Sequence, residues 1–282
     1  MHCAFVSEAQ AFTIAWLSDT QNYHNAYKPI FDGMTQWIAD NREALDIRFV
    51  FHTGDVVGSW SSEDQWRQAR ESMDILSSAS IPFLAACGNH DIGYRMNYAN
   101  FLKYVLSLRP ASMSQEYGDT GSRYELFSAN GRDYIFMGIA FSNKGPSEDE
   151  VNWINGVLRQ YSSRDAIIIT HSYLKKSAAY TTQGKAIFEK IVKANPNVFL
   201  VLCGHCRDIS YKNVQLDDDG DGDPDRTVYA ILSNFQGGKA GGGGYMRILD
   251  FRDSDIYIYT YSPYYDSCEY PKGKTEATVP LP

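Results

Sequence analysis

Short runs of apolar residues with β-type composition recur along this chain, and the most informative of them ends at a cluster of polar residues. Residues 81–86 form such a run, and Gly88, Asn89, His90 and Asp91 follow it almost directly. An Asn offers a neutral oxygen to a metal ion, a His offers a ring nitrogen or a proton, and an Asp can fix the tautomer of a neighbouring His. Because open α/β folds bind ligands beyond the carboxyl ends of their strands, this stretch predicts a functional site at the edge of a sheet.

Four other apolar runs of strand length also end at potential metal ligands. The run at 12–18 precedes Asp19 and Gln21, the run at 47–53 precedes Gly54-Asp55, the run at 166–170 precedes His171, and the run at 198–203 precedes Gly204-His205. Five predicted strand ends therefore each carry an oxygen or nitrogen ligand.

Amphipathic helices are predicted between these strands. Helical patterns occur at 30–39, after Ser62, at 98–106, after Ser147 and at 185–194. Ser62 and Ser147 are each followed three positions later by Gln or Glu, a capping-box pattern that marks a helix start. In the last third, β-type runs at 227–232, 245–251 and 255–261 follow one another without helices, and Asn130-Gly131 predicts a hairpin turn between 122–127 and 134–141.

The ordered set of strand-end motifs resembles the calcineurin-like metallophosphoesterases, whose pattern is Asp-x-His, Gly-Asp, Gly-Asn-His-Asp/Glu, a lone His and Gly-His-x-His. The resemblance extends from Ile14 to about Tyr261. It implies an α/β fold with four αββα layers, in which two mixed sheets are flanked by helices. It also implies a metal-dependent phosphoesterase, in which a metal-activated water attacks a phosphomonoester or a phosphodiester. We expect one domain over residues 1–282, with a core at about 11–262 and a C-terminal tail at 263–282.

The resemblance implies a role for each motif residue. The ligands of two divalent transition-metal ions (Mn, Fe or Zn, with Mn favoured) would be Asp19, Gln21, Asp55, Asn89, His171 and His205. Asp55 would be shared between the two ions. His90 would stabilise the transition state or protonate the leaving group, and Asp91 would orient the ring of His90.

Two residues depart from the family pattern. Gln21 and Arg207 stand where the pattern has histidines, and Gln can coordinate through its amide oxygen whereas Arg cannot coordinate at all. The Asp19 site should therefore bind its ion more weakly, or prefer an oxygen-loving ion such as Mn²⁺. Arg207 is a candidate phosphate ligand, with a surface or ion-paired Arg as the alternative. Cys206 could replace a missing imidazole ligand of the Asp19 site only if its thiolate pointed towards that site.

Residues just after the metal-bearing turns are candidates for the substrate cleft. These candidates are Asn22, Tyr23, Trp60, Tyr94, Arg95 and Tyr173, and simple packing explains each of them about as well. Asn22 and Tyr94 are the two that we take as substrate-binding. The expected substrate is a small-molecule or glycan-linked phosphate ester. His52 has no place in the pattern and is expected to be a packed strand residue.

Two low-complexity stretches allow more than one interpretation. Residues 217–225 begin like a calcium-binding EF-hand loop, but Val228 stands at the twelfth position, where a bidentate Glu is needed. The stretch is either a Ca²⁺ site or a solvated hairpin loop. Residues 237–244 are mostly glycine without the spacing of a phosphate-binding loop, and we expect a mobile loop there.

Composition excludes several classes of protein. The formal net charge is −8, so broad binding to nucleic acid is not expected, and no apolar window is long enough for a transmembrane segment. The five cysteines form no disulfide framework. The protein is either cytoplasmic or, as the C-terminal segment slightly favours, secreted or attached to the cell envelope after removal of a leader.

Two alternatives to an enzyme remain at this stage. The loss of two imidazoles is compatible with a degenerate single-metal protein that binds a phosphorylated or glycan ligand without catalysis. The Asp-rich loop alone would suit a calcium-stabilised adhesion module. The sequence names neither the physiological substrate nor the oligomeric state.

Overall fold

Two β-sheets form the centre of the molecule in the computed structural model, which describes residues 12–108, 114–271 and 275–282. The first sheet has six strands in the order β13-β12-β11-β1-β2-β3, and the second has seven in the order β4-β5-β6-β7-β8-β10-β9. Both sheets are mixed. The strands β1, β2 and β3 run parallel, as do β6, β7, β8 and β10, whereas their outer neighbours are antiparallel.

The strands of the first sheet are β1 (Phe12–Leu17), β2 (Ile47–His52), β3 (Phe83–Ala85), β11 (Met246–Phe251), β12 (Asp255–Tyr261) and β13 (Ala277–Pro280). Those of the second are β4 (Ser114–Tyr117), β5 (Ser122–Ala129), β6 (Arg132–Ile139), β7 (Asp165–Thr170), β8 (Val198–Cys203), β9 (Ile209–Leu216) and β10 (Arg226–Ser233). The helices are α1 (Lys28–Asp40), α2 (Glu63–Ser78), α3 (Asn89–Ile92), α4 (Ala99–Tyr104), α5 (Glu148–Gln160) and α6 (Thr182–Ile187), which continues as a π-helix over Phe188–Val192.

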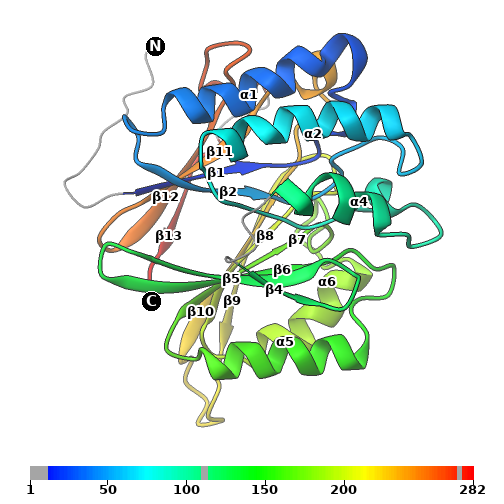
Figure 1. Cartoon of the computed structure of the whole chain (residues 1–282). Helices are drawn as coiled ribbons and strands as arrows, with labels where there is room; N and C mark the ends of the chain where they lie inside the picture. The colour runs from blue at the N-terminus through cyan, green and yellow to red at the C-terminus, as the bar shows by residue number, and fades with distance from the viewer. Residues whose placement is uncertain (1–11, 109–113, 272–274) are drawn as a thin grey trace.

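The alternation of side chains along each strand creates three apolar layers. Ile14 and Trp16 of β1 point into the layer between the two sheets, while Ala15 and Leu17 point to the layer under α1 and α2. On the second sheet, Ile167 faces the inner layer and its neighbours face α5 and α6. Because successive strand residues point to opposite faces, both sheets are buried on both sides. Figure 1 shows the resulting order of helices, sheet, sheet and helices, which confirms the predicted αββα sandwich.

The predicted helix starts are present. Ser62 accepts a hydrogen bond from the backbone N–H of Gln65, and Ser147 accepts one from that of Glu150. Each serine oxygen therefore satisfies a backbone donor that the first helical turn leaves free. The hairpin turn at Asn130-Gly131 also forms, with both residues at positive φ, as a two-residue turn of this kind requires.

Three strands were not predicted. β4 is short, β9 alternates between half-exposed and exposed residues, and β13 lies in the segment that was expected to be a tail. β13 pairs antiparallel with β12 and extends the first sheet at its edge. Few residues of β9 and β13 are buried, so their apolar patterns are weak, and pairing with a neighbour, not composition, defines these strands.

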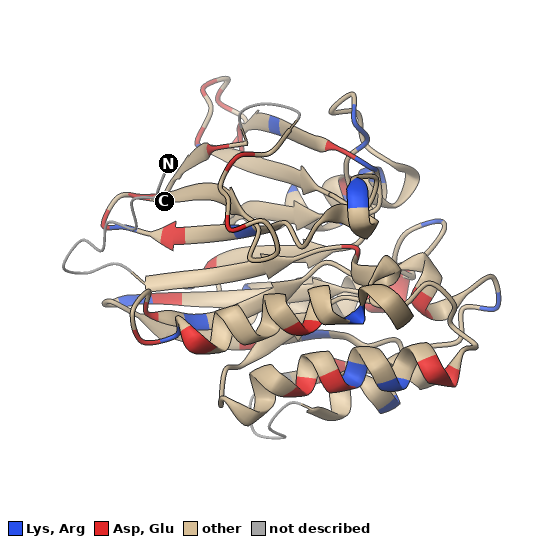
Figure 2. Ribbon diagram, turned by 90° about the horizontal axis from the view of Figure 1, so that it is seen from above, with Lys and Arg blue, Asp and Glu red and all other residues tan. Residues whose placement is uncertain are grey.

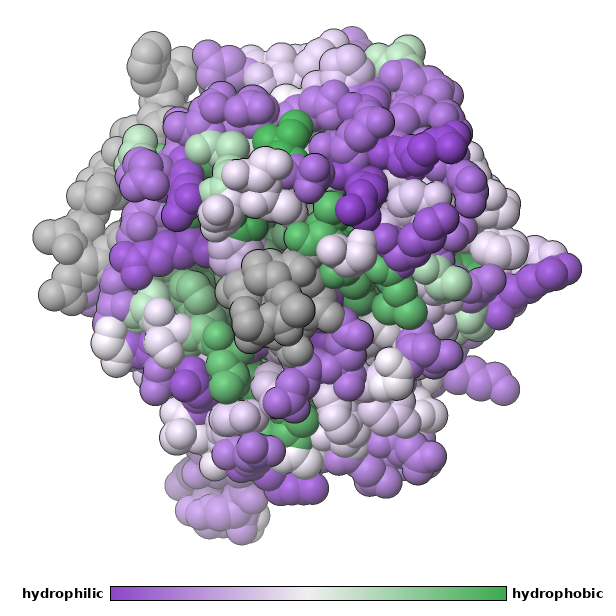
Figure 3. All heavy atoms as spheres, viewed as in Figure 1, coloured by the Kyte–Doolittle hydropathy of each residue, from purple (hydrophilic) through white to green (hydrophobic). Residues whose placement is uncertain are grey.

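The surface is predominantly polar on the faces shown. Figure 2 shows acidic and basic residues interspersed along the helices, and Figure 3 shows a mainly hydrophilic face with small apolar patches. Within the described residues, no helix combines the length and the apolar character that crossing a bilayer requires.

Candidate metal centre

The carboxyl ends of five strands bring the predicted metal ligands to one edge of the sandwich. Asp19 follows β1, Asp55 follows β2, Asn89 begins α3 just after β3, His171 follows β7, and His205 follows β8. Three of these residues have left-handed backbone angles, with φ of 53° at Asp19, 54° at Asp55 and 71° at His205. Such angles are uncommon outside glycine and concentrate where the fold holds a side chain in a functional position.

The Nε2 atom of His171 is the point at which the ligands converge. It lies 3.3 Å from Asp55 Oδ2, 3.1 Å from Asn89 Oδ1 and 3.2 Å from His205 Nδ1. On the other side of the ring, Nδ1 lies 2.8 Å from the backbone carbonyl of Thr53, which can only accept a proton. This contact fixes the tautomer that leaves the Nε2 lone pair facing the cluster, the usual arrangement for a metal-binding His.

Asp55 contacts both halves of the site. Its Oδ1 accepts the backbone N–H of His90 at 2.9 Å, and its Oδ2 accepts the amide of Gln21 at 3.0 Å. The other amide atom of Gln21, Oε1, is buried and has no hydrogen-bond partner. A buried oxygen without a partner is costly, and a cation would satisfy it.

Asp19 is buried next to Ser18 and His205. The Ser18 hydroxyl donates to its Oδ2, and the backbone N–H of His205 lies 3.2 Å from both carboxylate oxygens. Two glycines make room for the carboxylates, because a Cβ on Gly204 would lie 2.3 Å from Asp19 Oδ2 and one on Gly88 would lie 2.2 Å from Asp55 Oδ1.

Electrostatics favour a positive charge at this centre. Burial raises the pKa of Asp19 to about 7. Burial opposes the charged form of His171, but the carboxylates of Asp55 and Asp19 outweigh it and raise the pKa of His171 to about 9. Burial, with the nearby His171, lowers the pKa of His205 to about 4. The extra proton on one imidazole partly neutralises the buried carboxylates. A divalent cation bound at the cluster can replace that proton as the neutralising charge.

The donor set fits a divalent metal ion. Asp55, His171 and His205 offer ligand atoms that all lie within 4.8 Å of one another. Carboxylate, amide and imidazole ligands suit Mn²⁺, Fe²⁺ or Zn²⁺. Which ions bind, and whether two are held, remain predictions.

The structure corrects the role expected for Asp91. Its Oδ1 accepts the backbone N–H of Val57 at 3.0 Å and its Oδ2 accepts that of Gly88 at 2.8 Å, so the carboxylate fastens two site loops together. The His90 ring is held by the carbonyl of Gly58, 2.9 Å from Nδ1. Consecutive residues on a helical turn point in different directions, which explains why Asp91 does not reach the neighbouring ring.

The three candidate substrate-binding residues differ in their surroundings. Asn22 donates to the carbonyl of Gln236 at 3.2 Å, and so ties its turn to a neighbouring loop. Tyr94 is 79% exposed. Arg207 is exposed, and within the described part of the chain its guanidinium has no hydrogen bond or ion pair, so it is free to meet a ligand. Cys206 packs against the apolar layer under α5 and α6.

The glycine-rich stretch at 237–244 is packed tightly, contrary to the mobile loop that we expected. A Cβ on Gly242 would lie 2.7 Å from the hydroxyl of Tyr23, and one on Gly243 would lie 2.3 Å from Tyr265 Cε2. The backbone N–H of Gly244 donates to the same Tyr23 hydroxyl at 2.9 Å. Glycine is needed here for close packing on the Asp19–Tyr23 turn, in addition to its positive φ angles.

The structure also shows the surroundings of three other groups that the sequence singled out: His52, the Asp-rich loop and the cysteines. His52 is fully buried in β2 between Thr20 Oγ1 and the backbone N–H of Gly54, in agreement with the packed strand His that we expected. The carboxylates of Asp217, Asp219 and Asp221 come together on an exposed loop, but Val228 is buried in β10 and cannot complete an EF-hand ligand set. Cys268 is disulfide-bonded, whereas Cys87, Cys203 and Cys206 are free thiols.

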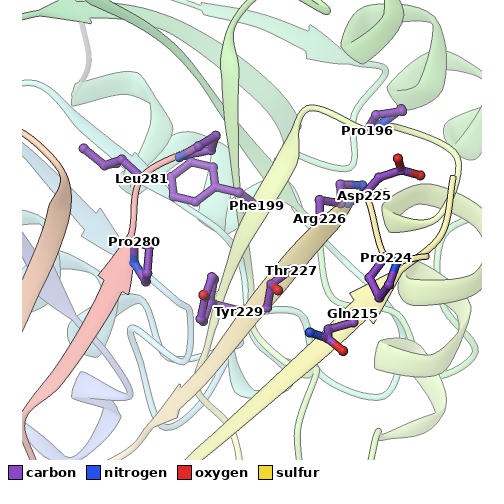
Figure 4. A pocket seen from close by; sticks show the side chains of 11 residues that line it. Pro196, Phe199, Gln215, Pro224, Asp225, Arg226, Thr227, Tyr229, Pro280 and Leu281 are labelled. Carbon is purple, nitrogen blue, oxygen red and sulfur yellow. The ribbon is translucent and has the colours of Figure 1, made fainter.

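A cavity of about 480 Å³ lies away from the metal centre. Phe199 and Thr227 line it near the starts of β8 and β10, and Pro280 lines it from β13 (Figure 4). Because the metal ligands follow the other ends of the parallel strands, this cavity lies at the opposite edge of the sandwich. It contains none of the site residues that the sequence predicted.

Comparison with known proteins agrees with the fold and with the motifs. A sequence model of the calcineurin-like phosphoesterase family matches residues 12–206, and the chain belongs to this family. The predicted class of protein, a metallophosphoesterase, is therefore confirmed.

One curated relative is similar over most of this chain. An uncharacterised protein of Bacillus subtilis, YvnB, is 41% identical over 259 residues, which are 90% of this chain and 20% of that protein. The chain thus spans about a fifth of the length of this curated relative.

Solved structures share the fold at low sequence identity. A dimetal phosphatase from Danio rerio has a TM-score of 0.65 at 13% identity, covering 96% of this chain and 99% of that chain. GAP50 of Plasmodium, described as the anchor in the inner membrane complex, has a TM-score of 0.62 at 14% identity, covering 97% and 90%. The purple acid phosphatase PPD1 from yellow lupin has a TM-score of 0.58 at 13% identity, covering 97% and 54%.

Proposed function

We propose that this chain hydrolyses a small phosphate ester at a centre of two divalent metal ions. The observation that carries the proposal is the convergence of Asp55, Asn89 and His205 on the Nε2 atom of His171, in a chain of the calcineurin-like phosphoesterase family. Asp55, Asn89, His171 and His205 would hold one ion, and Asp19, Gln21 and Asp55 the other. When bound, the ions would supply an activated water and neutralise charge on the phosphoryl oxygens.

The protein's own residues would orient the ester and move protons. His90 donates from Nδ1 to the Gly58 carbonyl, which leaves Nε2 without a bond to that carbonyl. In the imidazolium form Nε2 would carry the second ring proton and would pass it to the departing alkoxide, leaving a neutral imidazole. A hydrogen bond from the His90 backbone N–H to Asp55 Oδ1 ties the backbone of His90 to a predicted metal ligand. The His90 ring is thereby kept close to the metal centre. Arg207, exposed and without a protein partner among the described residues, would bind a phosphate oxygen.

Hydrolysis of two model esters tests this proposal. Metal-stripped protein is titrated with Mn²⁺ and assayed with nitrophenyl phosphate and with bis-nitrophenyl phosphate, beside Asp55→Asn and His90→Ala. We expect activity to return with the metal and to fall by about 10²-fold or more in both variants, since one removes a shared ligand and the other the proton donor. A correctly folded protein that hydrolyses neither ester at any metal concentration would refute the proposal.

A second candidate is a single-metal binding protein without catalysis. It is favoured by Gln21, whose amide nitrogen bonds to Asp55 and whose position the family pattern gives to a His. GAP50 of Plasmodium shares the fold and is described as an anchor. The αββα architecture therefore also occurs in a protein whose description is not that of an enzyme. One bound ion per chain, with phosphate binding and no turnover, would favour this candidate.

We also propose a location outside the cytoplasm. The disulfide at Cys268 supports it, because disulfide bonds persist mainly in oxidising compartments. Detection of the natural protein in the medium or the cell-envelope fraction, and not in the cytosol, is the expected result.

A further inference from the structure

The segments that hold the proposed proton donor also carry a half-buried tryptophan, an exposed tyrosine and an exposed arginine. We propose that Trp60, Tyr94 and Arg95, here called the ring platform, bind the leaving group of the phosphoester, and that this leaving group is an alcohol carrying a flat ring. The inference rests on the proposed function and specifies the class of substrate.

Trp60 is held at a fixed position by its backbone. Its carbonyl accepts two side-chain hydrogen bonds, from Trp66 Nε1 at 2.8 Å and from Asn100 Nδ2 at 2.9 Å. Its indole lies against the backbone of Gly93, where a Cβ would be only 2.2 Å from Trp60 Cδ1. Gly93 has a φ of 60°, so both its angle and this close contact require glycine. The indole is therefore positioned before any ligand arrives.

Tyr94 stands on the edge of this indole and faces solvent. The two ring centroids are 6.4 Å apart with an interplanar angle of 89°, and Tyr94 is 79% exposed. Arg95 lies along the tyrosine, with Cζ 5.5 Å from the ring centroid and Nε 3.2 Å from the hydroxyl. A large aromatic ring that is held in place but not buried gains little for folding, and gains most when a ligand covers it.

The same two loops carry the ring platform and the proton donor. Gly58, whose carbonyl binds the His90 ring, is two residues before Trp60. The backbone N–H of Gly93 donates to the carbonyl of Asn89 at 2.9 Å, so the contact with Trp60 lies one helical turn beyond a metal-ligand candidate. Under the proposed function the leaving oxygen would meet His90, so the group attached to that oxygen would extend towards the segments that carry the ring platform.

The chemistry of the ring platform selects among leaving groups. Two aromatic faces at right angles offer stacking and edge contacts to a planar ring. The guanidinium of Arg95 against Tyr94 repels a quaternary ammonium group, which would otherwise suit an aromatic site. A neutral or anionic ring-bearing alcohol fits all three residues.

The experiment compares a ring-bearing ester with one that has no ring. The kcat/KM values for phenyl phosphate and for glycerol 3-phosphate are measured with Mn²⁺-loaded protein and with Tyr94→Ala. We expect the ratio of the two values to fall about tenfold in the variant, mainly through the KM of phenyl phosphate, as the loss of one stacking partner predicts. The matched control is Tyr264→Ala, a tyrosine that is 55% exposed and lies outside the ring platform, which should leave the ratio unchanged.

A binding measurement separates this inference from the proposed function. Phenylphosphonate and methylphosphonate, which cannot be hydrolysed as esters, are titrated calorimetrically into the same proteins. Tighter binding of phenylphosphonate that is lost in Tyr94→Ala supports the ring platform even if the protein proves to be inactive. Hydrolysis of both esters with a ratio unaffected by Tyr94→Ala, or equal binding of the two phosphonates, would overturn the ring platform while leaving the phosphoesterase intact.

Discussion

Replacing Gly204 by Ala should remove the Asp19 metal site selectively. The backbone of Gly204 is not in the left-handed region, so alanine brings no conformational strain and acts only through its methyl group. That Cβ would lie 2.3 Å from Asp19 Oδ2 and 2.5 Å from Ser18 Oγ, where ordinary contacts begin at 3.4 Å. The carboxylate must therefore move by about 1 Å, several times the tolerance of about 0.2 Å for a metal ligand.

The size of the effect follows from that displacement. Overpacking in a buried site costs about 1–3 kcal/mol. For a chain of 282 residues this lowers the Tm by about 2–5 °C. A misplacement of about 1 Å at a catalytic centre can reduce activity about 10²-fold. We expect metal analysis after equilibration with Mn²⁺ to show close to one ion per chain in place of two.

Gly156→Ala is the matched control for Gly204→Ala. Gly156 lies in α5 with no atom within 4 Å of an added Cβ, so Gly156→Ala should keep full activity and gain about 1 kcal/mol from helix propensity. If Gly204→Ala retains two ions and wild-type turnover, the assignment of Asp19 as a ligand is wrong.

Three further predictions concern the same region. Protein stripped of metal with a chelator should lose stability in thermal melts as the pH rises from about 6.5 to 9, because the folded-state pKa of His171 is raised to about 9. The stabilisation by the protonated His171 is fully present below the unfolded-state pKa and is lost as the pH rises through the folded-state pKa. Added Mn²⁺ should flatten this pH profile. Asp91→Ala should lower the free energy of unfolding by about 1–3 kcal/mol, since two backbone N–H groups lose their acceptor, whereas exposed His90→Ala should leave it near the wild-type value in denaturant titrations. Gly242→Ala should be destabilising by about 1 kcal/mol or more despite its position in a glycine-rich loop, because φ is 123° and Tyr23 occupies the space, and a neutral result would restore the mobile-loop interpretation.

Much of the fold could be predicted from local patterns. The strand at 198–203 and the helix starts at Ser62 and Ser147 follow from apolar runs and capping residues, which are properties of neighbouring residues. The strands β9 and β13 could not be predicted in this way. Their pairing partners, β10 and β12, supply the hydrogen bonds that define them, and a partner's position is a property of the tertiary structure.

The sequence by itself determined which residue types end the strands, and so the chemistry available at the centre. Asp19, Asp55, Asn89, His171 and His205 could be proposed as ligands because each follows an apolar run and the runs occur in the family's order. Only the tertiary structure decided how these residues are oriented. The carbonyl of Thr53 sets the tautomer of His171, the carbonyl of Gly58 holds His90, and Asp91 binds two loops instead of a ring. Every residue has a backbone carbonyl and every residue except proline has an N–H group, so a sequence does not show which of them will make a given contact. Those contacts form only when distant segments pack together.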